Sequence, residues 1–391
     1  MPTLRERFFQ WLNGKHQGRI LFFPDITDWY KARRTPIGEP QRYEPGQIIY
    51  DEDPFHQGSR DMPALFHDWT LLDFYRRFNW GCPIHLYEWR DLERDGCQQT
   101  VRLEGRLEIT RLSTPLGELR QIRTQAADGS FCITEHFAKT IHDLDILRWA
   151  AQHTFSLVRG DRIQKALDAL GDFGVVDIPV GRSPFGAFIH DAMGLFKGIY
   201  ALHDETQAVE HFLDGLREPF LETIRAAAET HARIVIISDH ADEHLIAPPL
   251  FKKYCMPIYQ EACSILHKAG KIASTHVDGN IRGLLPLFPQ TEIDLLDGCT
   301  PAPMSNYGVD RLSHFLGSRL YAYCGIPSSL FMTHRPDEEI FQWAETIEQA
   351  SQGRMILNIG DILSPEGSID QVIRLGKWIQ EKDARHTSPF L

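Results

Sequence analysis

The feature of this sequence that most constrains its fold is a regular alternation of short apolar runs with amphipathic segments, which begins near residue 175. Six runs are predicted to be strands: residues 175–180, 233–239, 271–276, 293–297, 320–324 and 355–359. Amphipathic helices are predicted near residues 205–230, 248–269, 281–288, 309–317, 336–352 and 368–383. Repeated β-then-α units with buried strands indicate a parallel sheet covered by helices.

Two architectures contain such a sheet, a closed barrel and an open doubly wound sheet. Residues 19–26 add a seventh candidate strand, one fewer than a closed eight-stranded barrel requires. No G-x-G-x-x-G or G-x-x-x-x-G-K-[ST] motif follows any of the runs, so the phosphate-binding signatures of the doubly wound fold are missing. We therefore predict an α/β fold, a (β/α)8 TIM barrel, with residues 1–391 forming one barrel domain.

The amino-terminal third has a different pattern. A helix is predicted over residues 2–13, a Pro- and Gly-rich loop over 35–60, and a second helix near 63–79. Residues 97–137 alternate apolar and polar side chains in four short runs separated by turn residues. This segment is predicted to be an antiparallel β meander inserted into the barrel.

Charge and composition exclude several classes of function. The chain has 53 acidic and 41 basic residues and a net charge of −12, which opposes a nucleic-acid surface. It contains no apolar run of about 18 residues, and its charged start does not resemble a secretory signal. The seven cysteines form no C-x-x-C pair, which suits reduced thiols. We expect a cytoplasmic protein that binds neither nucleic acid nor membrane.

Polar side chains follow nearly every predicted strand. They are Asp25, Asp177 with Arg182, Asp239 with His240, His276 with Asp278, Asp297 with Cys299, Cys324, and Asn358 with Asp361. An Asp or Asn after a strand often caps the next helix, and that explanation suffices for any single example. Because βα barrels build their sites at the carboxyl ends of the strands, the recurrence favours a functional site there.

The most specific group is Ser274-Thr-His-Val-Asp-Gly-Asn280, in which His276 and Asp278 are two residues apart. Side chains two apart on a strand point to the same side, so an imidazole and a carboxylate can converge on one metal ion. Cys324 is a candidate thiolate ligand and Asp239 a candidate oxygen ligand, because zinc accepts nitrogen, sulfur and oxygen donors. The alternative is a histidine bonded to its neighbouring carboxylate without a metal.

Several residues near the predicted strand ends are candidates for substrate binding. Arg33 and Arg34 could hold a substrate carboxylate through paired hydrogen bonds, or could form a solvated surface pair. Trp29 and Tyr30 could line a pocket for a flat or methylated ligand, or could pack on the barrel rim. Asn358, in the last predicted strand, is a further candidate.

Four segments, in this order, resemble the uroporphyrinogen decarboxylase superfamily. They are residues 5–14 before 19–24, Ser238-Asp239 followed by the helix at 248–257, residues 275–279, and residues 357–365. The resemblance covers most of the chain. It implies a single (β/α)8 barrel with its site at the carboxyl ends of the strands.

This superfamily includes corrinoid-linked methyltransferases, which the chain resembles in the meander after the first helices. That branch holds zinc through a His-x-Cys motif and a later Cys, and the zinc activates a thiol as thiolate. His276 matches the histidine, whereas Asp278 and Asn358 stand where the cysteines would be. The resemblance therefore implies either zinc held by harder ligands such as Asp239 and Asp278, or no metal.

The decarboxylase branch resembles this chain less. That branch carries an arginine-rich Met-Arg-Gln-Ala-Gly-Arg motif, where this chain has Tyr30-Lys-Ala-Arg-Arg34. The late loop Asn358-Ile-Gly-Asp361 also lacks the histidine expected there. Carboxylates at the strand ends would oppose a tetrapyrrole that itself carries many carboxylates.

The resemblance to the methyltransferase branch implies an enzyme that moves a methyl group between a small methylated substrate or thiol acceptor and a corrinoid carried by a partner protein. Two alternatives stay open. One is a metal-independent decarboxylase or lyase in which Asp25 or Asp239 handles protons and Arg33 or Arg34 holds a carboxylate. The other is a non-catalytic binding subunit of a methyl-transfer system.

Overall fold

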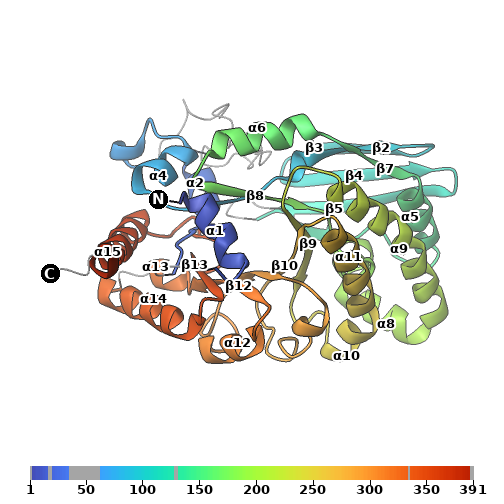
Figure 1. The fold of residues 1–391 in the computed structure, drawn as a ribbon. Helices are drawn as coiled ribbons and strands as arrows, with labels where there is room; N and C mark the ends of the chain where they lie inside the picture. Colours follow the sequence, from blue (N-terminus) through green and yellow to red (C-terminus); the bar gives the residue numbers. More distant parts are fainter. Residues whose placement is uncertain (1, 16–19, 35–61, 127–130, 333–334, 388–391) are drawn as a thin grey trace.

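The structure, a computed structural model, describes residues 2–15, 20–34, 62–126, 131–332 and 335–387 (Figure 1). Its centre is a parallel sheet in which the seven strands follow the order β1-β8-β9-β10-β11-β12-β13. Their bounds are Cys82–His85, Gly174–Pro179, Ile234–Ala241, Ile272–Val277, Leu295–Cys299, Tyr321–Ile326 and Met355–Ile359. From β8 onward the chain order equals the spatial order, as expected for successive βα units.

The segment that starts at Ile20 fills the eighth position of the ring. Phe22 forms a parallel bridge with Leu357 of β13, and the Phe23 amide donates to the Leu357 carbonyl. On the other side, the amide of Gly81, just before β1, donates to the Phe22 carbonyl. The ring of strands is thereby closed, and the predicted TIM barrel is confirmed.

One strand of the barrel was missed by the sequence prediction. β1 consists of only four residues, Cys-Pro-Ile-His, and its proline is unusual inside a sheet. The strand predicted at 19–26 contributes the extended residues from Ile20 onward, and its first residue lies outside the described part of the chain. β1 is therefore the strand that the sequence prediction lacked, and together with the segment from Ile20 it completes the ring of eight.

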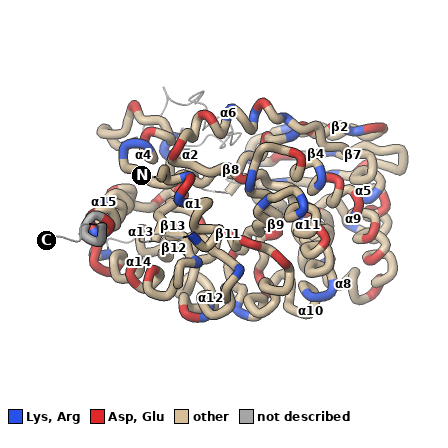
Figure 2. Tube along the Cα trace, viewed as in Figure 1, with Lys and Arg blue, Asp and Glu red and all other residues tan. Residues whose placement is uncertain are grey.

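Helices cover the outside of the ring (Figure 1). The main ones are α1 (Leu4–Leu12), α2 (Thr27–Arg34), α4 (Leu71–Phe78), α6 (Gly160–Leu170), α8 (Leu195–Asp204), α9 (Thr206–Ala228), α11 (Met256–Lys268), α12 (Val309–Leu316), α14 (Asp337–Ser351) and α15 (Ile369–Thr387). None of the described helices is long and apolar enough to cross a membrane. Basic and acidic residues are interspersed along them (Figure 2).

Two predicted helices differ in the structure. The helix expected at 63–79 starts only at Leu71, because Thr70 and Asp73 form a capping box that begins α4 there. The helix expected at 281–288 is a series of turns that ends in a 3-10 turn over Phe288–Gln290. Pro286 and Pro289 lack the amide hydrogens that a helix needs. The loop predicted at 35–60 lies outside the described residues.

The predicted meander is a four-stranded antiparallel sheet. It consists of β3 (Gln98–Glu104), β4 (Leu107–Thr114), β5 (Gly117–Gln125) and β6 (Phe131–Glu135). A small core of Cys97, Leu112, Leu119 and Ala150 packs it onto α5 (Asp143–Gln152). A separate pair, β2 (Arg90–Arg94) with β7 (Thr154–Val158), was not anticipated.

Candidate active site

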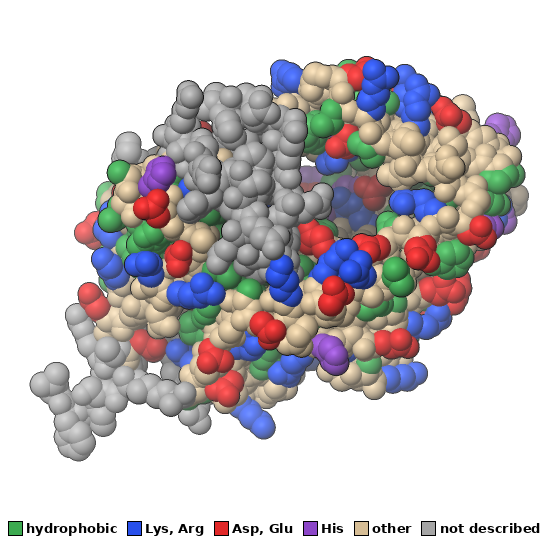
Figure 3. All heavy atoms as spheres, turned by 90° about the horizontal axis from the view of Figure 1, so that it is seen from above, with side chains coloured by type: hydrophobic (Ala, Val, Ile, Leu, Met, Phe, Trp, Pro, Cys, Tyr) green, Lys and Arg blue, Asp and Glu red, His purple; other side chains and the backbone are tan. Residues whose placement is uncertain are grey.

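A cavity of about 290 Å³ opens at the carboxyl ends of the barrel strands. Its polar lining comprises Asp25, Thr27, Asp28, Lys31, His85, Tyr87, His240, His276, Asp297, Tyr323, Asn358 and Asp361. Figure 3 shows a hollow in the molecule with histidine, carboxylate and basic side chains in it. The cavity is thus at the end of the barrel where TIM-barrel enzymes carry out catalysis.

His85, the last residue of β1, was not singled out from the sequence. Its register partner on β8 is Asp177, and its Nδ1 lies 2.7 Å from Asp177 Oδ1. Its Nε2 lies 3.7 Å from Asp297 Oδ2. Burial opposes the charged imidazole, but Asp177 and Asp297 outweigh it and raise the pKa of His85 to about 10. His85 is therefore a resident cation of the cavity.

His276 and Asp297 are register partners on β10 and β11. His276 Nδ1 lies 2.7 Å from Asp297 Oδ2, and its Nε2 lies 3.8 Å from Asp361 Oδ2. Burial opposes the charge on the imidazole, but the hydrogen bond to Asp297 raises the pKa of His276. Because Asp297 holds Nδ1, Nε2 is the nitrogen left to face a ligand.

The end of β9 presents His240 to the cavity and turns Asp239 away from it. His240 has a φ of +47°, unusual for a residue other than glycine, and the β9–β10 register shifts beside it. Asp239 is 0% exposed and accepts hydrogen bonds from the Ser183 amide, the Ser183 hydroxyl and the Tyr259 hydroxyl. Asp239 does not line the cavity, and its position is that of a buried anchor.

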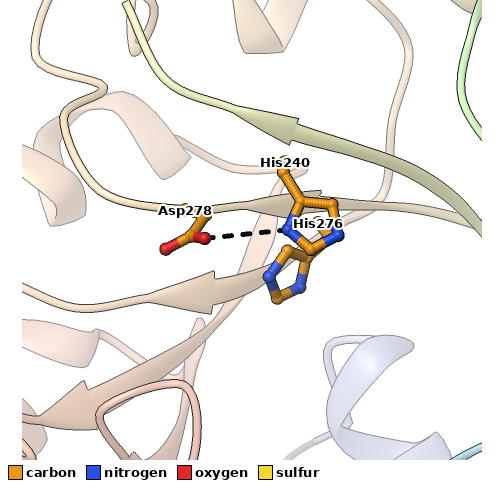
Figure 4. A group of neighbouring side chains, drawn as sticks. All are labelled: His240, His276 and Asp278. Atoms are coloured by element: carbon orange, nitrogen blue, oxygen red, sulfur yellow. Dashed lines mark ion pairs between the residues drawn. The ribbon is translucent and has the colours of Figure 1, made fainter. Parts of the chain in front are cut away.

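Three side chains form a candidate metal centre. One ligand atom from each of His240, His276 and Asp278 lies within 4.8 Å of the others (Figure 4). His240 Nδ1 is 3.7 Å from Asp278 Oδ2. Burial lowers the pKa of His240, which favours the neutral imidazole that a metal requires, whereas the raised pKa of His276 means that a metal would have to displace a proton there. The structure thus brings the predicted pair His276 and Asp278 together, with His240 as the third member.

Cys324, the predicted thiolate ligand, does not belong to this group. It is buried in β12, where its register partner is Cys299 of β11. Burial raises the pKa of the Cys324 thiol, so the protonated form is favoured. The thiol is also outside the lining of the cavity.

The donor set fits a catalytic divalent metal ion such as zinc. Two imidazoles and one carboxylate supply three protein ligands, and a tetrahedral ion then keeps its fourth position open. Asp297 holds the other ring nitrogen of His276, which is the usual support for a metal-binding histidine. The same donors also suit other divalent ions, because His-His-carboxylate sets are not selective for zinc.

Asp25 and Asn358, both predicted site residues, line the cavity side by side. The Asp25 amide donates to Asn358 Oδ1 over 2.9 Å, and Asn358 Nδ2 donates to the Asp361 carbonyl over 3.0 Å. Asn358 therefore braces the loop that carries Asp361. Burial raises the pKa of Asp25, whose Oδ1 accepts two hydrogen bonds from Thr27.

Four predicted substrate-binding residues on α2 lie outside the cavity lining. Trp29 and Tyr30 are each 1% exposed and pack against Phe74. Arg34 is 0% exposed and donates to the Trp69 carbonyl, and Arg33 donates to the Pro365 carbonyl. For Trp29 and Tyr30 the packing alternative describes the structure, whereas the buried Arg34 fits neither the carboxylate site nor the solvated surface pair. Lys31, from the same helix, lines the cavity instead.

A family model described as uroporphyrinogen decarboxylase (URO-D) matches residues 190–381. A search of curated proteins finds no match.

Two solved structures align with most of the chain. A methyltransferase from Methanosarcina mazei aligns over 98% of this chain and 99% of its own, with 15% sequence identity and a TM-score of 0.58. A B12-independent methionine synthase from Shewanella sp. W3-18-1 aligns over 93% of this chain and 97% of its own, with 9% identity and a TM-score of 0.45. The first of these shows a shared fold.

The matched region carries His240, His276, Asp278 and Asn358, and it runs from before β9 to the last helix. Asp25 and His85 precede it. Residues 190–381, just under half of the chain, are thus similar to the uroporphyrinogen decarboxylase family.

Proposed function

We propose that this protein is a methyltransferase that uses a metal ion held by His240, His276 and Asp278. The observation that carries the proposal is the convergence of these three donors at the carboxyl end of a superfamily barrel. The likeness in fold to a methyltransferase over 98% of this chain supports the reaction class. We also propose that the methyl group travels to or from a corrinoid carried by a partner protein.

The metal, when bound, supplies a Lewis acid that holds a thiolate or withdraws charge from a heteroatom. The protein's own residues prepare the cavity for this. Asp297 orients the His276 ring through Nδ1, and the low pKa of His240 keeps its ring neutral. His85 lies within ion-pair distance of both Asp177 and Asp297 and balances part of their negative charge.

The reaction is a transfer of a methyl group to a nucleophile. The bond between the methyl carbon and its heteroatom breaks, and the heteroatom keeps the electron pair. The methyl carbon would form its new bond to the nucleophile, for which a thiolate or a reduced corrinoid would serve. The cavity lies at the open end of the barrel, where a partner protein can present its cofactor.

Elemental analysis of protein purified without chelator tests the proposal. About one zinc per chain is expected in the wild type, and His276→Ala and Asp278→Ala should both lose it. His267→Ala is a matched control, because His267 pairs with Asp294 outside the cavity and should leave the metal content unchanged. A wild type without metal would contradict the proposal and favour acid–base chemistry at Asp25.

A further inference from the structure

A second cavity, of about 500 Å³, opens at the amino-terminal ends of the barrel strands. Its walls are α1, Leu167 of α6, Val175 and Val176 near the start of β8, and Arg233, which directly precedes β9. None of the described residues that line it also lines the candidate active site, which is at the other end of the barrel. Its volume is within the range of small-molecule sites. This cavity is therefore a separate candidate for ligand binding.

The charged residues that line the second cavity are mostly basic. Among the described residues of the lining, Arg5, Lys15 and Arg233 are basic and Glu6 is acidic. Glu6 Oε2 already accepts a hydrogen bond of 2.9 Å from the Thr3 amide. At neutral pH Lys and Arg are protonated and Glu is ionised, so this excess of positive charge depends on no histidine. In a chain with a net charge of −12, such a cavity favours an anionic ligand.

Arg233 is held in place by its neighbours but forms no ion pair with a carboxylate among the described residues. Its guanidinium lies over the Phe9 ring, 3.7 Å from the centroid. Its carbonyl accepts the amide of Ile272, which fixes the backbone just before β9. Partial burial lowers the pKa of Arg233, and no acidic group offsets this effect. A guanidinium that is oriented by an aromatic ring and lacks a counterion is suited to bind an anion.

Arg5 has a different role, because its side chain connects the walls of the cavity. Its Nε donates to the Gly174 carbonyl at 2.8 Å, and its Nη2 donates to the Leu167 carbonyl at 2.9 Å. Nearby carboxylates also offset part of its charge. Arg5 therefore attaches α1 to α6 and β8 and keeps the cavity formed. Arg233 is the guanidinium that remains for a ligand.

The rest of the lining narrows the class of ligand. Phe9, Leu167, Val175 and Val176 provide an apolar wall, and burial of apolar ligand surface against it is favourable. An inorganic anion would leave this wall unused. The planar guanidinium of Arg233 matches the geometry of a carboxylate, whose single negative charge it can balance. A carboxylate with an apolar body therefore fits both parts of the cavity.

We propose that the second cavity binds a small organic carboxylate with an apolar body, whose carboxylate group lies against Arg233. The ligand would contact both α1 and the start of β9, so its binding should also stabilise the folded protein. The cavity shares no described residue with the candidate metal centre. Carboxylate binding here and the proposed methyl transfer can therefore each occur without the other.

Calorimetric titration of the full chain tests this proposal with two probes, octanoate and the neutral octanamide. At about pH 7.5 octanoate is ionised, and it should bind at least about tenfold more tightly than octanamide. In Arg233→Gln, octanoate affinity should fall at least about tenfold. Arg225→Gln is the matched control, because it removes the same charge from α9, where Arg225 pairs with Glu218 outside the cavity. Its effect on octanoate should stay below about threefold.

A second variant covers the case in which Arg233→Gln does not fold. Gln10 lines the cavity at an exposed position of α1, so Gln10→Glu adds a carboxylate to the lining with little change in packing. It should weaken octanoate binding at least about threefold by repulsion. No measurable octanoate binding, equal affinities for the two probes, or an octanoate affinity that neither variant lowers would each overturn the inference. Loss of the metal from the wild type would leave these expectations unchanged.

Discussion

Replacing Asp239 with alanine should destabilise the protein by about 3–5 kcal/mol, the usual cost of removing one partner from a buried charged network. Asp239 accepts hydrogen bonds of 2.7 Å and 2.6 Å from Ser183 and of 2.8 Å from Tyr259. At roughly 1.5–3 kcal/mol for each bond to a charged group, the gross loss is about 5–9 kcal/mol. Part of this free energy is recovered, because the alanine variant no longer has a carboxylate that must be desolvated on folding.

Urea denaturation followed by tryptophan fluorescence measures this change as a lower midpoint with an unchanged slope. Asp239→Asn keeps an acceptor for the Ser183 amide and should lose only about 1–2 kcal/mol. Asp214→Ala, at an exposed position of α9, is the matched control and should stay within about 0.5 kcal/mol. A loss below about 1 kcal/mol in Asp239→Ala, together with lost activity, would refute the anchoring role and favour the catalytic role that the sequence suggested.

Three further predictions concern other parts of the barrel. A Cβ at residue 325 would lie 1.7 Å from the Gly360 carbonyl oxygen. Gly325→Ala should therefore lower the free energy of unfolding, measured in urea, by at least about 3 kcal/mol. Gly160→Ala is the control, because its Cβ meets no atom and the change should be nearly neutral. The pKa of His85 is raised to about 10, so its stabilisation is complete below its unfolded pKa of about 6.5 and is lost as the pH rises towards 10. The unfolding free energy of the wild type should therefore fall more between these pH values than that of His85→Gln, and parallel curves would contradict this. Chelator treatment should lower the melting temperature of the wild type but not that of His276→Ala, and equal shifts would argue against a metal at His276.

The sequence alone was sufficient to predict the barrel, because the spacing of apolar residues and the length of each apolar run are local properties. Six buried runs from residue 175 onward could only form a covered parallel sheet, and the meander at 97–137 could be recognised from its alternation and turns. The proximity of His276 and Asp278 was predicted from their spacing of two residues, although Asp278 lies just after the end of β10. β1 was missed because a run of four residues that includes a proline is too short to be recognised as a strand from its apolar pattern.

Only the tertiary structure decided which strand-end residues reach the cavity. Asp239 and His240 are adjacent in sequence, yet the positive φ of His240 sends the imidazole to the cavity and leaves the carboxylate buried against Ser183. Similarly, packing against Phe74 and Trp69 removed Trp29, Tyr30 and Arg34 from the site, although their residue types suited a pocket.

The ion pairs of the cavity were also invisible in the sequence. His85 joins Asp177 and Asp297 only because β1, β8 and β11 meet around one ring. Composition fixes how many charges a chain carries, but strand register and ring closure decide which charges neutralise each other. That is why the candidate site residues His276, Asp278, Asp25 and Asn358 could be predicted individually, whereas their partners and the charge of the cavity required the fold.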